Sequence, residues 1–137
     1  MKASKYEIPE DLLYTQEHEW ARIVSPTEVV VGITDYAADM LHDVVFVILP
    51  AVGGSQKRGS SVASVESVKS TSDVMAPLSG EVLAVNDALA QHPEKVNQSP
   101  YGEGWFFKVR PSALESESGA LLTPAAYADL VARLADV

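Results

Sequence analysis

The chain has 137 residues, no cysteine and a formal net charge of −9. Its length suits one domain with its own hydrophobic core, so a single domain over residues 1–137 is expected. The lack of cysteine excludes disulfides, thiolate metal sites and cysteine nucleophiles. The acidic balance argues against nucleic acid and anionic membranes as partners, because both bind clustered Lys and Arg.

The amino-terminal segment lacks the apolar stretch of an export signal, and no run in the chain approaches membrane-spanning length. These features predict a protein of a reducing compartment, the cytoplasm or, in a eukaryote, the mitochondrial matrix. The three histidines, His18, His42 and His92, are scattered without the spacing of metal ligands. No metal site is therefore expected.

Most of the chain consists of short strand-like runs separated by turn residues. The strands are expected mainly within residues 10–85 and 104–110. The run 44–49 is continuous and apolar and ends at a proline, which predicts a strand buried on both faces. The runs 62–68 and 74–75 flank a short polar turn and are predicted to form a hairpin.

Helices are predicted at two places. Thr34 or Asp35 can cap a short internal helix. Near the C-terminus Thr123 is a suitable N-cap with a proline after it, and apolar residues then recur at helical spacing, which predicts a helix over 123–135. The serine- and glutamate-rich stretch 115–119 before it is expected to be a mobile connector. Together these elements favour an antiparallel sandwich or barrel with a little helix.

One lysine stands out. Lys69 lies in the polar turn between the two apolar runs, with small hydroxyl residues on both sides. A turn lysine is usually no more than a solvated surface charge. Here, however, a modifying enzyme could approach the amine, while the apolar flanks would anchor the hairpin and present the turn rigidly. The pattern therefore makes Lys69 a candidate for carrying a covalent group, with a solvated surface charge as the open alternative.

The turn belongs to a longer pattern. Glu66 and Lys69, followed by Asp73 and the run 76–82, are similar to the lipoylation motif of the H proteins of the glycine cleavage system. Further stretches resemble the same family in the same order, and the resemblance covers about residues 10–135. These stretches are 17–20, 31–37, 43–50, 85–89, 96–101 and 104–105.

The resemblance implies a mainly β fold, the lipoyl- or biotinyl-type barrel-sandwich hybrid of antiparallel strands, with a short internal helix and a C-terminal helix. It implies that Lys69 carries lipoate as an amide on its side-chain nitrogen. The protein would then be a carrier and not a catalyst. Its arm would take the aminomethyl group of glycine from the P protein, a decarboxylase, to the T protein, an aminomethyltransferase. The L protein, a dihydrolipoyl dehydrogenase, would reoxidise the arm.

The loaded arm carries an amine, and excluding water would protect it during transfer. The resemblance points to Glu19 and Asp73 as carboxylates of a cleft that receives this amine. Each also has a simpler interpretation, Glu19 as a solvated carboxylate at a strand start and Asp73 as a cap of the turn. Glu66, three residues before Lys69, is predicted to be recognised by the lipoylating enzyme, a lipoate ligase or an octanoyl or lipoyl transferase.

Three residues depart from the family pattern. His42 stands where the family usually has glycine, which suggests a positive φ or tight packing at that position. Glu17 adds a carboxylate near the arm cleft, where it could bind the amine or lie in solvent. Met75 replaces a commoner aromatic or polar residue. His18, which belongs to the matching stretch 17–20, is interpreted as a packed or surface imidazole and not as a base.

Other functions fit the sequence less well. Lipoyl domains of 2-oxoacid dehydrogenase complexes are shorter and typically show Asp-Lys-Ala at the lysine, and biotin carriers show Met-Lys-Met, whereas this chain has Val-Lys-Ser. An H-like protein that donates lipoyl groups to 2-oxoacid dehydrogenase complexes is the alternative within the family. An enzyme that uses Glu19 or Asp73 as acid or base ranks last, because nothing pairs either residue with a nucleophile.

Overall fold

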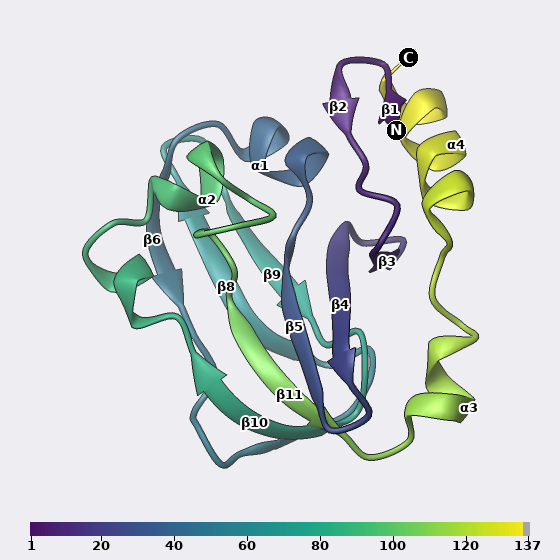
Figure 1. The fold of residues 1–137 in the computed structure, drawn as a ribbon. Coiled ribbons are helices and arrows are strands. Elements are labelled where there is room, and N and C mark those ends of the chain that lie inside the picture. Colours follow the sequence, from purple (N-terminus) through teal and green to yellow (C-terminus); the bar gives the residue numbers. More distant parts are fainter. Residues whose placement is uncertain (136–137) are drawn as a thin grey trace.

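The computed structural model describes residues 1–135 and is mainly β (Figure 1). In chain order its elements are β1 (Lys2–Ala3), β2 (Tyr6–Glu7), β3 (Leu13–Tyr14), β4 (Glu19–Ser25), β5 (Glu28–Ile33), α1 (Asp35–Leu41), β6 (Val44–Ile48), β7 (Ser55–Gln56), β8 (Ser61–Ser67), β9 (Thr71–Met75), β10 (Gly80–Val85), the 3-10 turn η1 (Asp87–Ala90), α2 (Lys95–Gln98), β11 (Phe107–Pro111), α3 (Leu114–Ser118) and α4 (Pro124–Ala135).

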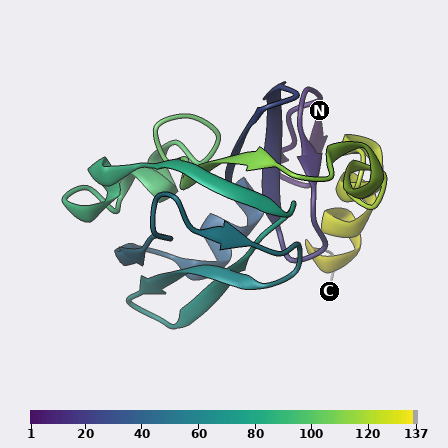
Figure 2. The same ribbon diagram turned by 90° about the horizontal axis from the view of Figure 1, so that it is seen from below.

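Two antiparallel sheets face each other and enclose the main core. The larger sheet has the strand order β3-β4-β5-β11-β10-β7, and the smaller has the order β6-β8-β9. Figure 2 shows them as two layers. Inward-facing side chains from both sheets, such as Val31, Val65 and Val109, are fully buried between them. The predicted fold class, an antiparallel barrel-sandwich hybrid with short helices, is confirmed.

A second core lies outside the sandwich, where the N-terminal segment and α4 lie side by side (Figures 1 and 2). Its centre is Trp20, fully buried, whose Nε1–H donates to the carbonyl of Pro100 at 2.9 Å. The indole crosses Gly32 on the neighbouring strand, where a Cβ would meet the ring at 2.6 Å. Glycine at this position therefore lets the largest side chain of the chain lie flat on the sheet.

Both predicted helices are present with their caps. Oγ1 of Thr34 accepts the N–H of Ala37 at 3.2 Å at the start of α1. Oγ1 of Thr123 accepts the N–H of Ala126 at 3.2 Å at the start of α4. Within residues 1–135, no helix is both long and apolar enough to cross a membrane.

The prediction that the run 44–49 is buried on both faces is wrong. Val44 and Val47 face the core, whereas Val45, Phe46 and Ile48 are 49%, 50% and 55% exposed. The pairing of β6 with β8 shifts between Val44 and Phe46, so two successive residues face outward there. The continuous apolar run of β6 therefore has one face in the core and one apolar face exposed to solvent.

The prediction of a mobile connector at 115–119 is also wrong. Most of this stretch belongs to the short helix α3, and Glu117 within it fixes the turn before β10. Its carboxylate accepts both the backbone N–H and the hydroxyl of Ser79, each at 2.7 Å. A glutamate that composition alone assigns to solvent is thus a hydrogen-bonded anchor between two elements.

His42 ends α1 in a backbone conformation that is unusual for a residue with a side chain. Its φ is 61° and its ψ is −148°, a region that essentially only glycine occupies without strain. Hydrogen bonds hold the backbone there, since its N–H donates to the carbonyl of Asp39 at 3.2 Å and its carbonyl accepts the side-chain N–H of Asn97 at 2.6 Å. The positive φ suggested by the family's glycine is therefore confirmed.

We expect His42→Gly to raise the free energy of unfolding by about 1 kcal/mol. The relief of about 1–3 kcal/mol of strain exceeds the entropic cost of a glycine, about 0.5–1 kcal/mol. Urea unfolding of the two proteins measures the difference. His42→Ala is the matched control, because it removes the imidazole but keeps the Cβ. Equal stabilisation by both variants would show that the side chain, and not the backbone, is the source of the strain.

Candidate functional site

Lys69 lies at the exposed tip of the hairpin formed by β8 and β9. The turn is organised by Ser67, whose Oγ accepts the backbone N–H groups of Lys69 and Ser70 at 3.2 and 3.0 Å. The same hydroxyl donates to the carbonyl of Ser70 at 3.1 Å. Val68 donates its N–H to the carbonyl of Asp43 at 3.1 Å, which ties the tip to the start of β6. The lysine is thus exposed on a backbone that is held at several points.

The role of Ser67 is not predicted from the sequence, in which the serines around Lys69 are interpreted only as small residues that allow access. Ser67 is in fact 7% exposed and binds the backbone two and three residues ahead. Serine hydroxyls commonly stabilise turns in this way. A serine two residues before the lysine was therefore a local signal that could have been used.

A cleft of about 290 Å³ opens between the hairpin, α1 and the start of β4. Small-molecule sites hold about 300–1,000 Å³, so the cleft has room for a small group or for the end of a chain. Glu19 and Asp73 both line it, so the structure brings these two predicted residues together. The other lining residues are Glu17, His18, Ile33, Tyr36, Ala37, Met40, Leu41, Val65, Ser72 and Val74.

Glu19 forms the buried floor of the cleft. It is 1% exposed, so the alternative of a solvated carboxylate is wrong. Oε1 accepts the hydroxyl of Thr15 at 2.5 Å and Oε2 accepts the backbone N–H of Met75 at 3.2 Å. Burial raises the pKa of Glu19 to about 7, although these hydrogen bonds act in the opposite direction. Met75 takes part through its backbone alone, so the departure from the family pattern at this side chain leaves the contact intact.

Asp73 lies on the cleft wall nearer the tip. It is exposed, and it pairs with Ser64 inside β9, away from the turn that it was alternatively expected to cap. Four residues of extended strand span at most about 13 Å, so a group attached to Lys69 can fold back along β9 to reach it. Glu17 is exposed at the rim of the same cleft, and therefore both lines it and contacts solvent.

Glu66 is not part of the cleft. It is exposed on the outer face of β8, where it lies opposite Phe46 on one side and Thr71 on the other. This is the face on which β6 presents its exposed apolar side chains. Glu66 is thus accessible to a protein that approaches the hairpin from outside.

His18 forms part of the cleft wall as a packed residue. Its Nδ1 lies 2.9 Å from the hydroxyl of Tyr127, and its ring centroid lies 4.9 Å from that of Tyr36. Burial lowers the pKa of the His18 imidazole below its ordinary value. The interpretation of His18 as a packed imidazole is therefore supported, whereas its tyrosine partners were not foreseen because they are distant in sequence.

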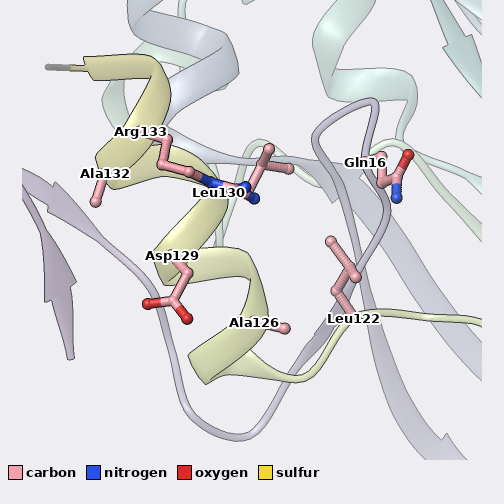
Figure 3. A pocket seen from close by; sticks show the side chains of 7 residues that line it. All are labelled: Gln16, Leu122, Ala126, Asp129, Leu130, Ala132 and Arg133. Atoms are coloured by element: carbon pink, nitrogen blue, oxygen red, sulfur yellow. The ribbon is translucent and has the colours of Figure 1, made fainter.

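A larger hollow of about 590 Å³ lies elsewhere, between α4 and the loop that contains Gln16 (Figure 3). Leu122 and Leu130 contribute apolar walls, and Asp129 and Arg133 lie at its edges. None of its lining residues belongs to the hairpin. Within residues 1–135, no group of three or more His, Asp or Glu side chains is placed to hold a metal ion.

An antiparallel sandwich that presents one lysine on a fixed turn, beside a cleft lined by three carboxylates, has the architecture of a carrier domain. Comparison with known proteins gives the family. The model of the family described as glycine cleavage H-protein matches residues 12–133. The chain therefore belongs to the H-protein family, the lipoyl carriers of the glycine cleavage system.

Individual relatives agree over nearly the whole chain. The glycine cleavage system H protein of Rubrobacter xylanophilus is 53% identical over 122 residues, which are 89% of this chain and 93% of that protein. The probable H protein of Pyrococcus abyssi is 45% identical over 134 residues, which are 98% and 99% of the two chains. The crystal structure of the H protein from Mycobacterium marinum superposes with a TM-score of 0.83 at 42% identity, covering 89% of this chain and 97% of that one.

The raised pKa of Glu19 predicts a pH-dependent stability. Because this pKa rises from 4.5 in the unfolded chain to about 7 in the folded protein, the folded state binds more protons between these values. Stability from Glu19 is therefore complete below about pH 4.5 and falls as the pH rises through about 7, by about 3 kcal/mol in total. Urea unfolding at a series of pH values measures this slope.

Glu19→Gln should remove most of the slope, because the amide cannot ionise and can still accept the N–H of Met75. Glu17→Gln is the matched control, since Glu17 is adjacent and exposed, and it should leave the slope unchanged. A slope that persists in Glu19→Gln would contradict the assignment.

Proposed function

We propose that this protein carries lipoate on Lys69 and shuttles the aminomethyl group of glycine from the P protein to the T protein, with reoxidation by the L protein. The single observation that carries the proposal is the exposed, hydrogen-bonded lysine turn beside the cleft of Glu19 and Asp73. When attached, the lipoyl group supplies a disulfide whose sulfur accepts and releases the aminomethyl unit. The protein itself supplies tethering, orientation and shelter, and no catalytic residue is proposed.

Each side chain then has a physical task. Lys69 sets the point of attachment, and tethering raises the concentration of the arm at each docked enzyme. The carboxylates of Glu19 and Asp73 favour the ammonium group of the loaded arm over water. The apolar wall of the cleft, which includes Ile33, Leu41 and Val65, excludes the water that would hydrolyse the bound unit.

The partners would contact the hairpin from its outer side. Val45, Phe46 and Val68 are about half or more exposed around the tip, at 49%, 50% and 69%, and Glu66 lies opposite Phe46. Exposed apolar patches commonly mark protein contacts. The lipoylating enzyme and the three enzymes of the cycle all have to reach the same amine or its arm. The cytoplasm, or the mitochondrial matrix in a eukaryote, stays the predicted location.

We expect Lys69→Arg to abolish both lipoylation and glycine cleavage without unfolding the protein. A guanidinium remains protonated and cannot be acylated as an amine can, and the exposed tip tolerates the change. Intact mass after expression in a lipoylation-competent host, together with a reconstituted glycine cleavage assay, measures the two effects. Lys57→Arg, in another exposed turn, is the control and should keep one lipoyl-sized addition. A lipoyl-sized addition on the Lys69→Arg protein would refute the assignment.

We expect Glu66→Lys to slow lipoylation by about tenfold or more and to leave the fold intact. A reversed charge in an enzyme contact introduces repulsion that a solvated position would not feel. The rate is followed by mass with the purified lipoylating enzyme. Glu115→Lys makes the same charge change at an exposed position of α3 and should not slow the reaction. Normal lipoylation of Glu66→Lys would remove Glu66 from the recognised surface.

A further inference from the structure

Two buried hydroxyl groups stand behind the imidazole of His18. The hydroxyl of Tyr127 lies 2.9 Å from Nδ1 of His18 and 2.7 Å from Oγ1 of Thr34. Both Tyr127 and Thr34 are fully buried. The direction of the hydrogen bonds among His18, Tyr127 and Thr34 is therefore fixed by the requirement that each buried hydroxyl has an acceptor.

The hydrogen bonds of Thr34 determine the direction of the other two groups' hydrogen bonds. Its Oγ1 already accepts the backbone N–H of Ala37 at 3.2 Å as the cap of α1. Among residues 1–135, the hydroxyl of Tyr127 is the only hydrogen-bond acceptor near the hydroxyl proton of Thr34. Thr34 therefore donates to Tyr127, and Tyr127 donates to Nδ1 of His18. The opposite direction would leave the proton of Thr34 buried and unpaired, which proteins avoid.

The consequence for His18 follows from the chemistry of imidazole. A nitrogen that accepts a hydrogen bond carries no proton, so the single ring proton lies on Nε2. Tyr127 contacts Nδ1 and not Nε2, and His18 lines the cleft with Glu19 and Asp73. The ring also packs on Tyr36 at 4.9 Å between centroids, so it cannot turn freely.

We propose that Thr34 and Tyr127 lock His18 as the neutral Nε2–H tautomer and thereby reserve the carboxylates of the arm cleft for the cationic end of the arm. If His18 were protonated, its positive charge would lie next to Glu19. It would then compete with the ammonium group of the arm for the carboxylates. His18, Tyr127 and Thr34 are thus positioning residues, and none of them reacts. The part of this inference that concerns the arm rests on the proposed function, whereas the tautomer of His18 does not depend on it.

The tautomer is tested first, on the unlipoylated protein. Nitrogen-15 NMR of the imidazole should place the proton of His18 on Nε2 and should show titration below the ordinary value. In Tyr127→Phe the ring should titrate at higher pH, because Nδ1 has lost its donor. The charged or titratable groups around the ring are Glu17, Glu19, Tyr36, Asp73 and Tyr127. Tyr14→Phe is the control, since Tyr14 stacks on Tyr127 at 4.5 Å but binds the carbonyl of Pro9.

The cleft is tested second, on the lipoylated and loaded protein. At a pH between the His18 pKa values that the NMR titration gives for the wild type and for Tyr127→Phe, Tyr127→Phe should lose its aminomethyl group to water about fivefold or more faster than the wild type. The two proteins should differ little at about pH 8. Asp73→Asn, a change in the cleft itself, should speed the loss at both pH values.

A proton on Nδ1 of wild-type His18 would overturn the inference, and so would unchanged titration in Tyr127→Phe. Equal loss rates for Tyr127→Phe and the wild type at the lower pH would overturn it as well. A wild-type protein that does not protect its loaded arm at all would refute the cleft of the proposed function, and with it the second half of this inference. The NMR result distinguishes that failure from a failure of the tautomer.

Discussion

The carboxylate of Glu19 joins the two sheets at the floor of the arm cleft, and the shape of the site depends on this link. Glu19 begins β4 in the larger sheet, whereas Met75 ends β9, the edge strand of the smaller one. The bond from the N–H of Met75 to Oε2 therefore satisfies an edge-strand donor that has no neighbouring strand. Thr15 fixes the other oxygen. β9, which follows the lysine turn, is thus hydrogen-bonded at its C-terminal end to the larger sheet.

The buried carboxylate of Glu19 is a structural link, and it is also a group whose ionised form a cation in the cleft would stabilise. Among the described residues Glu19 forms no ion pair, and its charge is offset only by neutral donors. Its pKa is accordingly raised to about 7. A cation placed in the cleft would stabilise the ionised form, and by linkage the ionised form would hold the cation more strongly. A glutamine has one acceptor oxygen and could accept from Thr15 or from Met75 but not from both, whereas the carboxylate accepts both donors.

The sequence was most informative where the determinants are local. The hairpin around Lys69 and the caps Thr34 and Thr123 depend on residues close in the chain, and these were predicted correctly. The errors concern contacts across the fold. Burial of one face of β6 depends on a bulge against β8, and the order in 115–119 depends on a bond from Ser79 to Glu117. The partner of His18 lies 109 residues away, beyond the reach of pattern reasoning.

The exposed apolar face of β6 fits the proposed carrier function. A strand buried on both faces would require a further layer over β6, β8 and β9, and that layer would cover the outer flank of the lysine turn. The bulge instead keeps Val44 and Val47 in the core and leaves Val45 and Phe46 outside. In the proposed function several enzymes approach one amine in turn, so the surface around it has to stay uncovered. The inner face of β6, with Val44 and Val47, still completes the main core.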